Sequence, residues 1–272
     1  MAWRELLPFA LRVELRRLLH LPRVLLDAPR TARERLGPDD AAPFVHLLAD
    51  GRSPLRRFEG PLDRLQLGKE HNVALAAARL DGLVAWPGQI LSYHAAVGRP
   101  SRLRGFRPGL ELHDGQAGAG VGGGCCQVSN LLYQLGLRGG MKIVERHRHG
   151  LDLFPDHGRS VPFGCGATVF YSYRDLKLEN PLPQPVLLRM GVQDGELWGE
   201  LRCEAPVGFR VRVYEVGHRI YRAHDRWIRE NRIRRRFTDL TGKLLLDEEV
   251  AHNVARLCYE PELVADGLEE AA

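Results

Sequence analysis

Two adjacent cysteines, Cys125 and Cys126, follow a run of glycines and precede an amphipathic segment. A cysteine can act as a nucleophile or a metal ligand, or it can be a small buried residue. The glycines allow a tight turn, and a helix that begins there has unpaired N–H groups and a positive dipole end. These features favour a thiolate and could hold a developing oxyanion. The stretch predicts a nucleophile, a ligand or a structural thiol.

Helical spacing distinguishes the two cysteines. The apolar residues of the following segment recur at i, i+3, i+4 and i+7, namely Val128, Leu131, Leu132 and Leu135. At about 100° per residue, Cys126 projects away from this stripe, on the side of Asn130 and Tyr133. Cys125 lies toward the stripe. We therefore predict that Cys126 is the presented thiol and that Cys125 is a packing residue.

A histidine pair follows the cysteines in the stretch MKIVERHRHG, which has the composition of a strand. Strand alternation places His147 and His149 on one face. An imidazole beside a thiol can serve as a base, and two imidazoles with a thiol can bind a metal. The spacing matches neither Cys-x-x-Cys nor His-Glu-x-x-His, so we predict neither a metal nor another cofactor. An ordinary surface histidine is the remaining alternative.

The elements that must position these residues change in type along the chain. A helix is expected over residues 71–83, and the glycine-rich stretch 111–120 is expected to be a loop. Strands dominate after residue 140, with hairpin turns at Asp194-Gly195 and Thr241-Gly242. The order predicts an α+β fold. It has a helical N-terminal part, the Cys-bearing helix on a mostly antiparallel sheet, and a β-rich C-terminal extension.

The totals suit a globular protein of one large domain or two small ones, because the chain has 272 residues and 44% of them are hydrophobic. We divide it into a helical segment with a linker (1–43), a core (44–205) and the C-terminal extension (206–272). Five cysteines are an odd number, which favours reduced thiols over a disulfide framework. No apolar run is long enough for a membrane span and no signal peptide is visible. We expect a cytoplasmic protein, or one at the membrane periphery.

Two basic regions raise the question of partners. Leucines recur at helical spacing near the N-terminus with arginines between them, which predicts either a helix packed on the body or a peripheral membrane contact by residues 1–36. The stretch RWIRENRIRRRF (226–237) could contact phosphates. Acidic residues follow it closely, and 35 of the 39 basic residues of the chain are arginines, a general bias. We therefore predict no specific nucleic-acid binding.

A wider pattern joins these motifs. It comprises Pro87-Gly88 with Leu91-Ser92-Tyr93, GGGCCQVSNLLY (122–133), ERHRH (145–149), Ala167-Thr168-Val169 and DLKLEN (175–180). It resembles the VanW family, named for an accessory protein of glycopeptide-resistance clusters, over roughly residues 44–205. The resemblance places the family's cysteine on Cys126 and its histidine on His149, whereas His147 falls at a variable position.

The resemblance implies a function and a set of site residues. We expect a Cys–His acyl-transfer or hydrolytic enzyme that acts on a peptide or peptidoglycan precursor; a non-catalytic binding module with a structural Gly-Cys-His pocket is the alternative. The residues expected to line the pocket or an oxyanion site are Gly123, Gly124, Gln127, Asn130 and Tyr133. The family's Asp before Ala-Thr is Gly166 here, and the Ser after its His is Gly150. Asp175 and Asn180 are the candidates to orient the histidine instead.

Overall fold

The structure is a computed structural model that describes residues 9–56, 64–113, 116–148, 150–152, 161–171, 173–261 and 268–270. It confirms the predicted α+β class with mostly antiparallel sheets. The helical elements are α1 (Phe9–Asp27), η2 (Ala28–Arg30), α2 (Arg64–Ala78), α3 (Tyr93–Val97), η3 (Arg102–Arg104) and α4 (Cys125–Arg138). The helix expected over 71–83 thus begins and ends earlier than predicted.

A four-stranded antiparallel sheet forms one side of the core. Its order is β1-β10-β9-β2, with β1 (His46–Pro54), β10 (Glu196–Cys203), β9 (Val186–Gln193) and β2 (Val84–Ala85). The β9–β10 hairpin turns at Asp194 and Gly195, whose φ values are 52° and 76°. Such left-handed backbone suits a tight two-residue hairpin turn, so the predicted Asp-Gly turn is confirmed.

Helix α4 lies between this sheet and a second one, of order β3-β8-β6, with β3 (Ile90–Ser92), β8 (Lys177–Glu179) and β6 (Lys142–Glu145). Gly199 of β10 lies against Leu135 of α4, and Gly136 on another side of α4 lies against Leu178 of β8. The helix is therefore covered on more than its leucine face. This explains why nine of its residues are buried.

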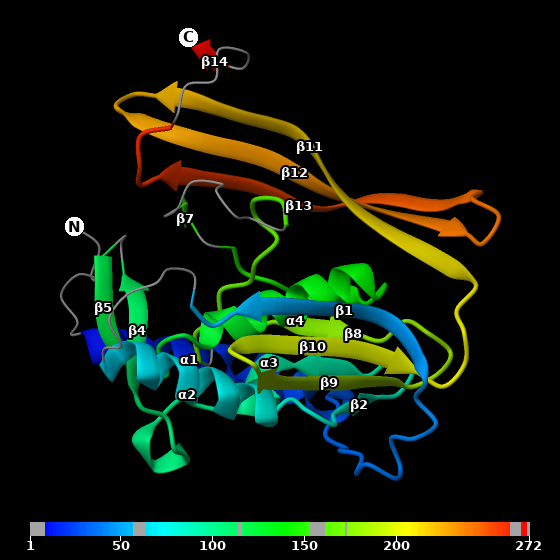
Figure 1. The fold of residues 1–272 in the computed structure, drawn as a ribbon. Helices are drawn as coiled ribbons and strands as arrows, with labels where there is room; N and C mark the ends of the chain where they lie inside the picture. The colour runs from blue at the N-terminus through cyan, green and yellow to red at the C-terminus, as the bar shows by residue number, and fades with distance from the viewer. Residues whose placement is uncertain are drawn as a thin grey trace.

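The C-terminal part is a long antiparallel ribbon that runs along one side of the molecule (Figure 1). It consists of β11 (Phe209–Ala223), β12 (Arg226–Asp239) and β13 (Leu244–Leu257), with β14 (Leu268–Glu270) and β7 (Leu151–Asp152) parallel at its edges. Arg235 ties it to the core, because its Nη1 donates to the carbonyl of Met141 over 2.7 Å. The predicted turn at Thr241-Gly242 is confirmed by the β12–β13 pairing. The division of the chain into three parts remains a prediction.

The stretch 111–120 was expected to be a loop, and that expectation is wrong. It belongs to an antiparallel hairpin of β4 (Pro108–His113) and β5 (Gln116–Val121). The cause is close packing: a Cβ on Gly109 would lie 2.8 Å from the carbonyl oxygen of Gly123 and from the amide nitrogen of Lys69. Glycine here allows the hairpin to lie directly against the turn before α4 and against α2.

Candidate functional site

The glycine run positions Cys126 through a turn between β5 and α4. Gly122 and Gly124 have φ values of 91° and 95°, a left-handed backbone that glycine adopts without strain. Gly123 is buried against β4, where an added Cβ would lie 2.3 Å from the carbonyl oxygen of Gly109. Gly124 is the N-cap of α4, so Cys126 is the second residue of the helix, as predicted.

Burial raises the pKa of both cysteine thiols. Cys125 is 6% exposed, and burial raises the pKa of its thiol to about 12. Cys126 is partly exposed, yet burial also raises its pKa, although a hydrogen bond with the backbone of Val169 acts in the opposite direction. The direction of this shift is opposite to that expected from the helix start, because burial disfavours the charged thiolate.

Alkylation should reveal this difference. We expect iodoacetamide at pH 7.5 to modify the exposed Cys258 first, Cys126 more slowly and Cys125 last. A raised pKa reduces the thiolate fraction at neutral pH, so the rate at Cys126 should still be rising above about pH 9, the ordinary value for a thiol. Peptide mapping by mass spectrometry between pH 6 and pH 10 measures each site. A rate at Cys126 that levels off below about pH 8 would contradict the expectation.

The backbone donors near Cys126 are mostly engaged. The N–H of Cys125 donates to the carbonyl of Gly122 over 3.2 Å, and that of Gln127 donates to the carbonyl of Gly124 over 2.9 Å. The amide of Gln127 is committed elsewhere, because Nε2 donates to Oγ of Ser53 and to the carbonyl of Pro54 in β1. The N–H of Cys126 is thus the remaining candidate among these three for an oxyanion donor.

The segment 166–169 covers the face of α4 that carries Cys126. Oγ of Ser129 donates to the carbonyl of Ala167 over 2.7 Å, and the N–H of Ala167 donates to Oδ1 of Asn130 over 2.8 Å. An added Cβ on Gly166 would lie 2.8 Å from that same Oδ1. Cys126 therefore faces away from the leucine stripe, as predicted, but it faces a covering segment. The carboxamide of Asn130 fills the space beside Gly166.

The segment with His147 lies beside this covering segment, but the predicted strand does not extend to it, because β6 ends at Glu145. The N–H of Thr168 donates to the carbonyl of His147 over 2.8 Å. Nε2 of His147 lies 2.9 Å from Oε1 of Glu145, so the imidazole of His147 already has a carboxylate partner. His149 lies outside the described residues, so its pairing with Cys126 stays a prediction. The described contacts place His147, two residues before it in the sequence, beside the segment that touches the thiol.

Arg146 fastens the covering segment to the rest of the molecule. Its Nε donates to the carbonyl of Gly166 over 2.9 Å, and its Nη1 donates to Oδ1 of Asn253 in β13 over 3.2 Å. The guanidinium also lies 5.1 Å from the centre of the Tyr133 ring, a cation–π contact. Tyr133 is fully buried, and burial raises its pKa to about 12. Its ring supports the site from within the core.

A network of buried charges joins two of the sequence motifs. Nζ of Lys177 lies 3.0 Å from Oε2 of Glu145 and 2.7 Å from Oδ2 of Asp27 at the end of α1. Burial acts to raise the pKa of Glu145, but hydrogen bonds with His147, the backbone of Asp175 and Lys177 lower it to about 2. Glu145 is therefore ionised, and it holds β6 and β8 together beside His147.

Asp175 is placed beside a histidine that sequence reasoning missed. Its Oδ2 accepts a hydrogen bond from Oγ of Ser92 over 2.6 Å, and its Oδ1 accepts one from the N–H of His94 over 2.9 Å. Nδ1 of His94 lies 3.7 Å from Oδ1. Burial lowers the pKa of His94, which favours the neutral imidazole. The only sequence signal was a Ser two residues before this His, as expected for the N-cap of α3.

Asn180 has a structural position. Its Nδ2 donates to the carbonyls of Ala85 and Gln184 over 2.8 and 2.9 Å, and its Oδ1 accepts from the N–H of Leu182 over 2.9 Å. Both amide hydrogens are therefore used to hold the chain between β8 and β9. Of the two candidates to orient a histidine, Asp175 is the one with a histidine beside it.

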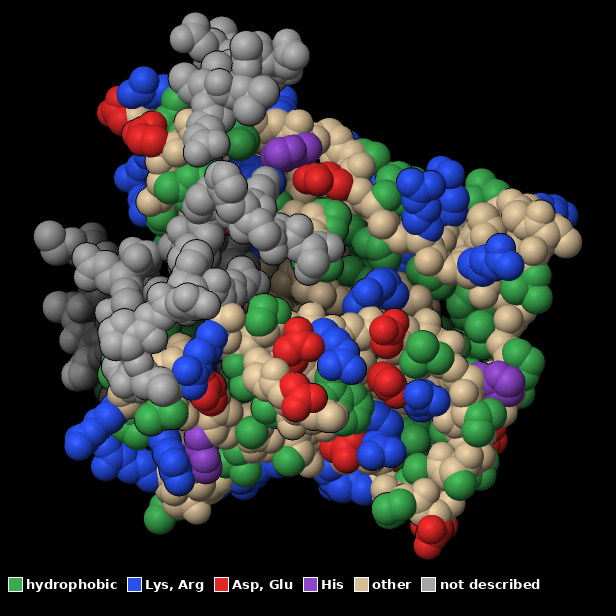
Figure 2. Space-filling view, viewed as in Figure 1, with side chains coloured by type: hydrophobic (Ala, Val, Ile, Leu, Met, Phe, Trp, Pro, Cys, Tyr) green, Lys and Arg blue, Asp and Glu red, His purple; other side chains and the backbone are tan. Residues whose placement is uncertain are grey.

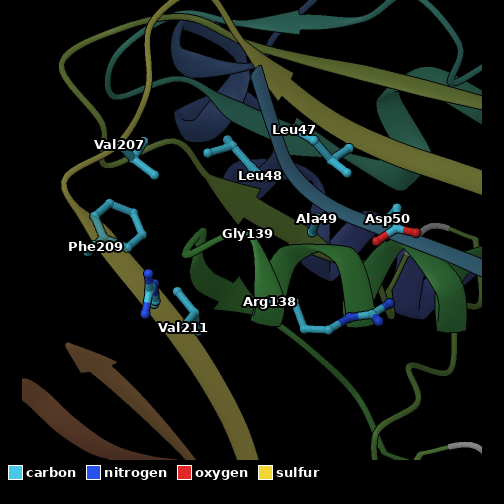
Figure 3. Close-up of a pocket in the computed structure, with 10 residues that line it drawn as sticks. Leu47, Leu48, Ala49, Asp50, Arg138, Gly139, Val207, Phe209 and Val211 are labelled. Carbon is cyan, nitrogen blue, oxygen red and sulfur yellow. The ribbon is translucent and has the colours of Figure 1, made fainter. Parts of the chain in front are cut away.

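A groove lies at the other end of α4 (Figure 3). It has a volume of about 350 Å³ and is lined by residues 47–50 of β1, Val207, residues 209–211, Arg138 and Gly139. Because a helix rises about 1.5 Å per residue, this end is about 18 Å from Cys126. No cluster of three or more side chains suited to bind a metal occurs in the described part of the chain.

Residues 68–202 match the family model described as VanW like protein. This region belongs to the VanW family. We call residues 68–202 the VanW region; it includes the Cys126 turn, the segment with His147, and Glu145 and Lys177 of the buried charge network.

Two curated relatives match the chain. Uncharacterized protein YoaR of Bacillus subtilis (strain 168) is 32% identical over 147 residues, which are 53% of this chain and 46% of that protein. Vancomycin B-type resistance protein VanW of Enterococcus faecalis (strain ATCC 700802 / V583) is 29% identical over 136 residues, half of each protein. The chain thus spans about half the length of these relatives. No solved structure matches significantly.

Proposed function

We propose that the VanW region is a cysteine-dependent acyl-transfer or hydrolytic enzyme, with Cys126 as the nucleophile and His149 as the base. One observation carries the proposal. The segment that contacts the Cys126 thiol through Val169 is hydrogen-bonded through Thr168 to His147, two residues before His149 in the sequence. This arrangement supports a couple in which the cysteine lies at a helix start and the histidine comes from the segment that follows β6.

The chemistry follows from the protonation state of the thiol. Because burial raises the pKa of Cys126, the thiol is protonated at neutral pH, and a base must take its proton as sulfur attacks the carbonyl. The carbon–sulfur bond forms, the bond to the leaving group breaks, and the imidazolium returns its proton to the departing amine. Water then releases the acyl group in hydrolysis, or an acceptor amine releases it in transfer. The N–H of Cys126 is suited to the oxyanion.

The substrate class is inferred from the relatives. One of them is named a vancomycin resistance protein, and glycopeptide-resistance clusters rework the stem peptides of peptidoglycan. We therefore propose a peptide or a peptidoglycan precursor as the substrate. Glu145 and Asp175 are the carboxylates that could support the base in place of the family's Asp, because each already lies near a histidine.

An acyl probe tests the nucleophile. We expect p-nitrophenyl acetate to acetylate Cys126 in the intact chain, with nitrophenolate as the leaving group. Cys126→Ala should remove this acetylation, and His149→Ala should slow it, because the base is lost. Cys258→Ala, at an exposed thiol, is the matched control and should leave acetylation of Cys126 unchanged. Mass spectrometry of the acyl-enzyme is the measurement.

Two results would contradict the proposal. The first is acetylation that continues at an unchanged rate in His149→Ala. The second is an experimental structure that places Sγ of Cys126 and the His149 imidazole more than about 8 Å apart, since the proton transfer needs about 4 Å or one bridging water.

A binding module without catalysis is the second candidate. Two observations favour it: the raised pKa of Cys126 and the glycine at position 166. A structural thiol should be revealed by melting, because a hydroxyl in an apolar site costs about 1–3 kcal/mol. On this second proposal, Cys126→Ser melts at a much lower temperature and no acetylation of Cys126 is seen. On the first, the larger loss of stability falls on Cys125→Ser.

The other partner expectations remain proposals. No helix within the described residues is long and apolar enough to cross a membrane. The arginines of β12 face acidic partners on β13, with Arg234 and Arg236 on Asp247 and Arg235 on Glu248. This pairing reduces the charge that phosphates could meet, and it supports the prediction that the chain binds no specific nucleic acid.

A further inference from the structure

Helix α1 presents an apolar face to solvent. Four of its leucines are more than 60% exposed: Leu18 (65%), Leu19 (80%), Leu25 (63%) and Leu26 (78%). They occur at i, i+1, i+7 and i+8, so they share one side of the helix. Leu11 and Leu15 extend the same side and are 47% and 37% exposed. Exposed leucines in such number on one helix mark an interaction surface rather than ordinary surface residues.

The polar side of α1 faces the protein instead. Oδ2 of Asp27 lies 2.7 Å from Nζ of the buried Lys177, and the ring of His20 lies 6.4 Å from that of Tyr173. His20 and Asp27 are also seven residues apart, on the side roughly opposite the centre of the leucine face. The helix therefore contacts the body, as one of the two alternatives predicted, but through its polar side and with its leucines exposed.

The charge of α1 indicates what covers these leucines. The helix contains four arginines, Arg12, Arg16, Arg17 and Arg23, and two acidic residues, Glu14 and Asp27. Both acidic residues have partners on the body, Arg99 for Glu14 and Lys177 for Asp27. A leucine face on such an arginine-rich helix is suited to the surface of an anionic bilayer.

A second exposed leucine lies close to α1. The Arg99–Glu14 contact, at 3.7 Å, places the chain before η3 beside the helix. In η3, Leu103 is fully exposed between Arg102 and Arg104. This element projects at the lower left of Figure 1, where Lys and Arg side chains also gather in Figure 2. The basic and apolar character of α1 thus continues onto a neighbouring element.

We infer that the chain binds the surface of an anionic phospholipid membrane through the leucine face of α1, which lies in the plane of the interface. The charge selects this occupant, because an arginine-rich helix whose two acidic residues are paired with the body would repel a second copy of itself but attract anionic headgroups. This inference does not depend on catalysis by the VanW region.

Vesicle flotation tests the inference with the full chain. We expect it to float with vesicles of phosphatidylglycerol and phosphatidylcholine in low salt, and to bind vesicles of phosphatidylcholine alone much more weakly. The double variant Leu19→Gln/Leu26→Gln should bind the anionic vesicles at least about tenfold more weakly, because it lacks two leucines that the bilayer buries. Leu244→Gln/Leu245→Gln is the matched control, since these leucines are 55% and 56% exposed near the β12–β13 turn. It should bind as the parent does.

Three results would overturn the inference: no binding to the anionic vesicles, equal loss in the two double variants, or a dimer in solution that Leu19→Gln/Leu26→Gln abolishes. The last would make a second copy the occupant. Acetylation of Cys126 by p-nitrophenyl acetate, measured without vesicles, should be the same in the parent and in Leu19→Gln/Leu26→Gln. Failure of the membrane inference is therefore separable from failure of the proposed enzyme.

Discussion

Replacing Lys177 by methionine is expected to lower the free energy of unfolding by about 3 kcal/mol. The side chain of Lys177 is 6% exposed, and its ammonium group contacts the carboxylates of Glu145 and Asp27. Methionine removes the shared cation and leaves two carboxylates close together, one of them nearly buried. Removing one partner of a buried ion pair is costly because the other charge stays desolvated. Urea denaturation at pH 7, followed by circular dichroism, measures the loss.

Lys142→Met is the matched control for this prediction. Lys142 also pairs with a carboxylate, that of Glu179 at 3.4 Å, but its side chain is 64% exposed. An exposed pair contributes little, so the control should change the free energy of unfolding by less than about 1 kcal/mol. Equal losses in the two variants would show that burial of Lys177 is not the cause.

The same network predicts how stability depends on pH. The pKa of Glu145 is about 2 in the folded chain, below the ordinary 4.5. Its ionised form therefore stabilises the fold fully above about pH 4.5, and this contribution is lost as the pH falls toward 2. In Lys177→Met one of the groups that lower this pKa is absent, so the acid-dependent loss should be smaller and should be complete at a higher pH than in the parent.

Replacing Gly123 by alanine is expected to lower the free energy of unfolding by about 2–3 kcal/mol. The new Cβ would lie 2.3 Å from the carbonyl oxygen and 2.5 Å from the carbonyl carbon of Gly109. Both are backbone atoms of β4, so relief requires either the hairpin or the start of α4 to move. Because Cys126 follows three residues later, its alkylation rate should change as well. Chemical denaturation and peptide mapping measure the two effects.

Gly208→Ala serves as the control for Gly123→Ala. An added Cβ at position 208 meets no atom within 4 Å, and the residue has no left-handed φ. Alanine there should change stability by less than about 1 kcal/mol, and in the stabilising direction, because the unfolded chain loses freedom. A loss below about 0.5 kcal/mol in Gly123→Ala would mean that the hairpin relaxes easily and that the close approach is not what requires glycine.

The sequence predicted those features that depend on neighbouring residues. The leucine periodicity placed α4 and turned Cys126 away from its stripe, and Asp194-Gly195 predicted a hairpin turn that the structure contains. The prediction of a loop over 111–120 was wrong because the small residues there hide the alternation of a strand. What makes them a strand is the fit of Gly109 against Gly123, a contact between distant parts of the chain.

Contacts across long chain distances could not be predicted. Asp175 was singled out only as a polar candidate, and its neighbour His94 is 81 residues away in sequence. Lys177 joins Glu145 to Asp27, which is 150 residues from it. Nothing in a local pattern shows which carboxylate a buried lysine will meet, because the choice depends on how sheets and helices stack.

By itself, the sequence determined the α+β class, the position of Cys126 at a helix start and the membership of residues 68–202 in the VanW family. The tertiary structure alone decided the state of the thiol and the direction of α1. Local geometry favoured a thiolate at Cys126, but packing around it removes water and raises its pKa. Periodicity identified an amphipathic N-terminal helix, but only the structure shows its leucines exposed and Asp27 paired with Lys177. In both cases desolvation and charge pairing between distant residues outweigh the local preference.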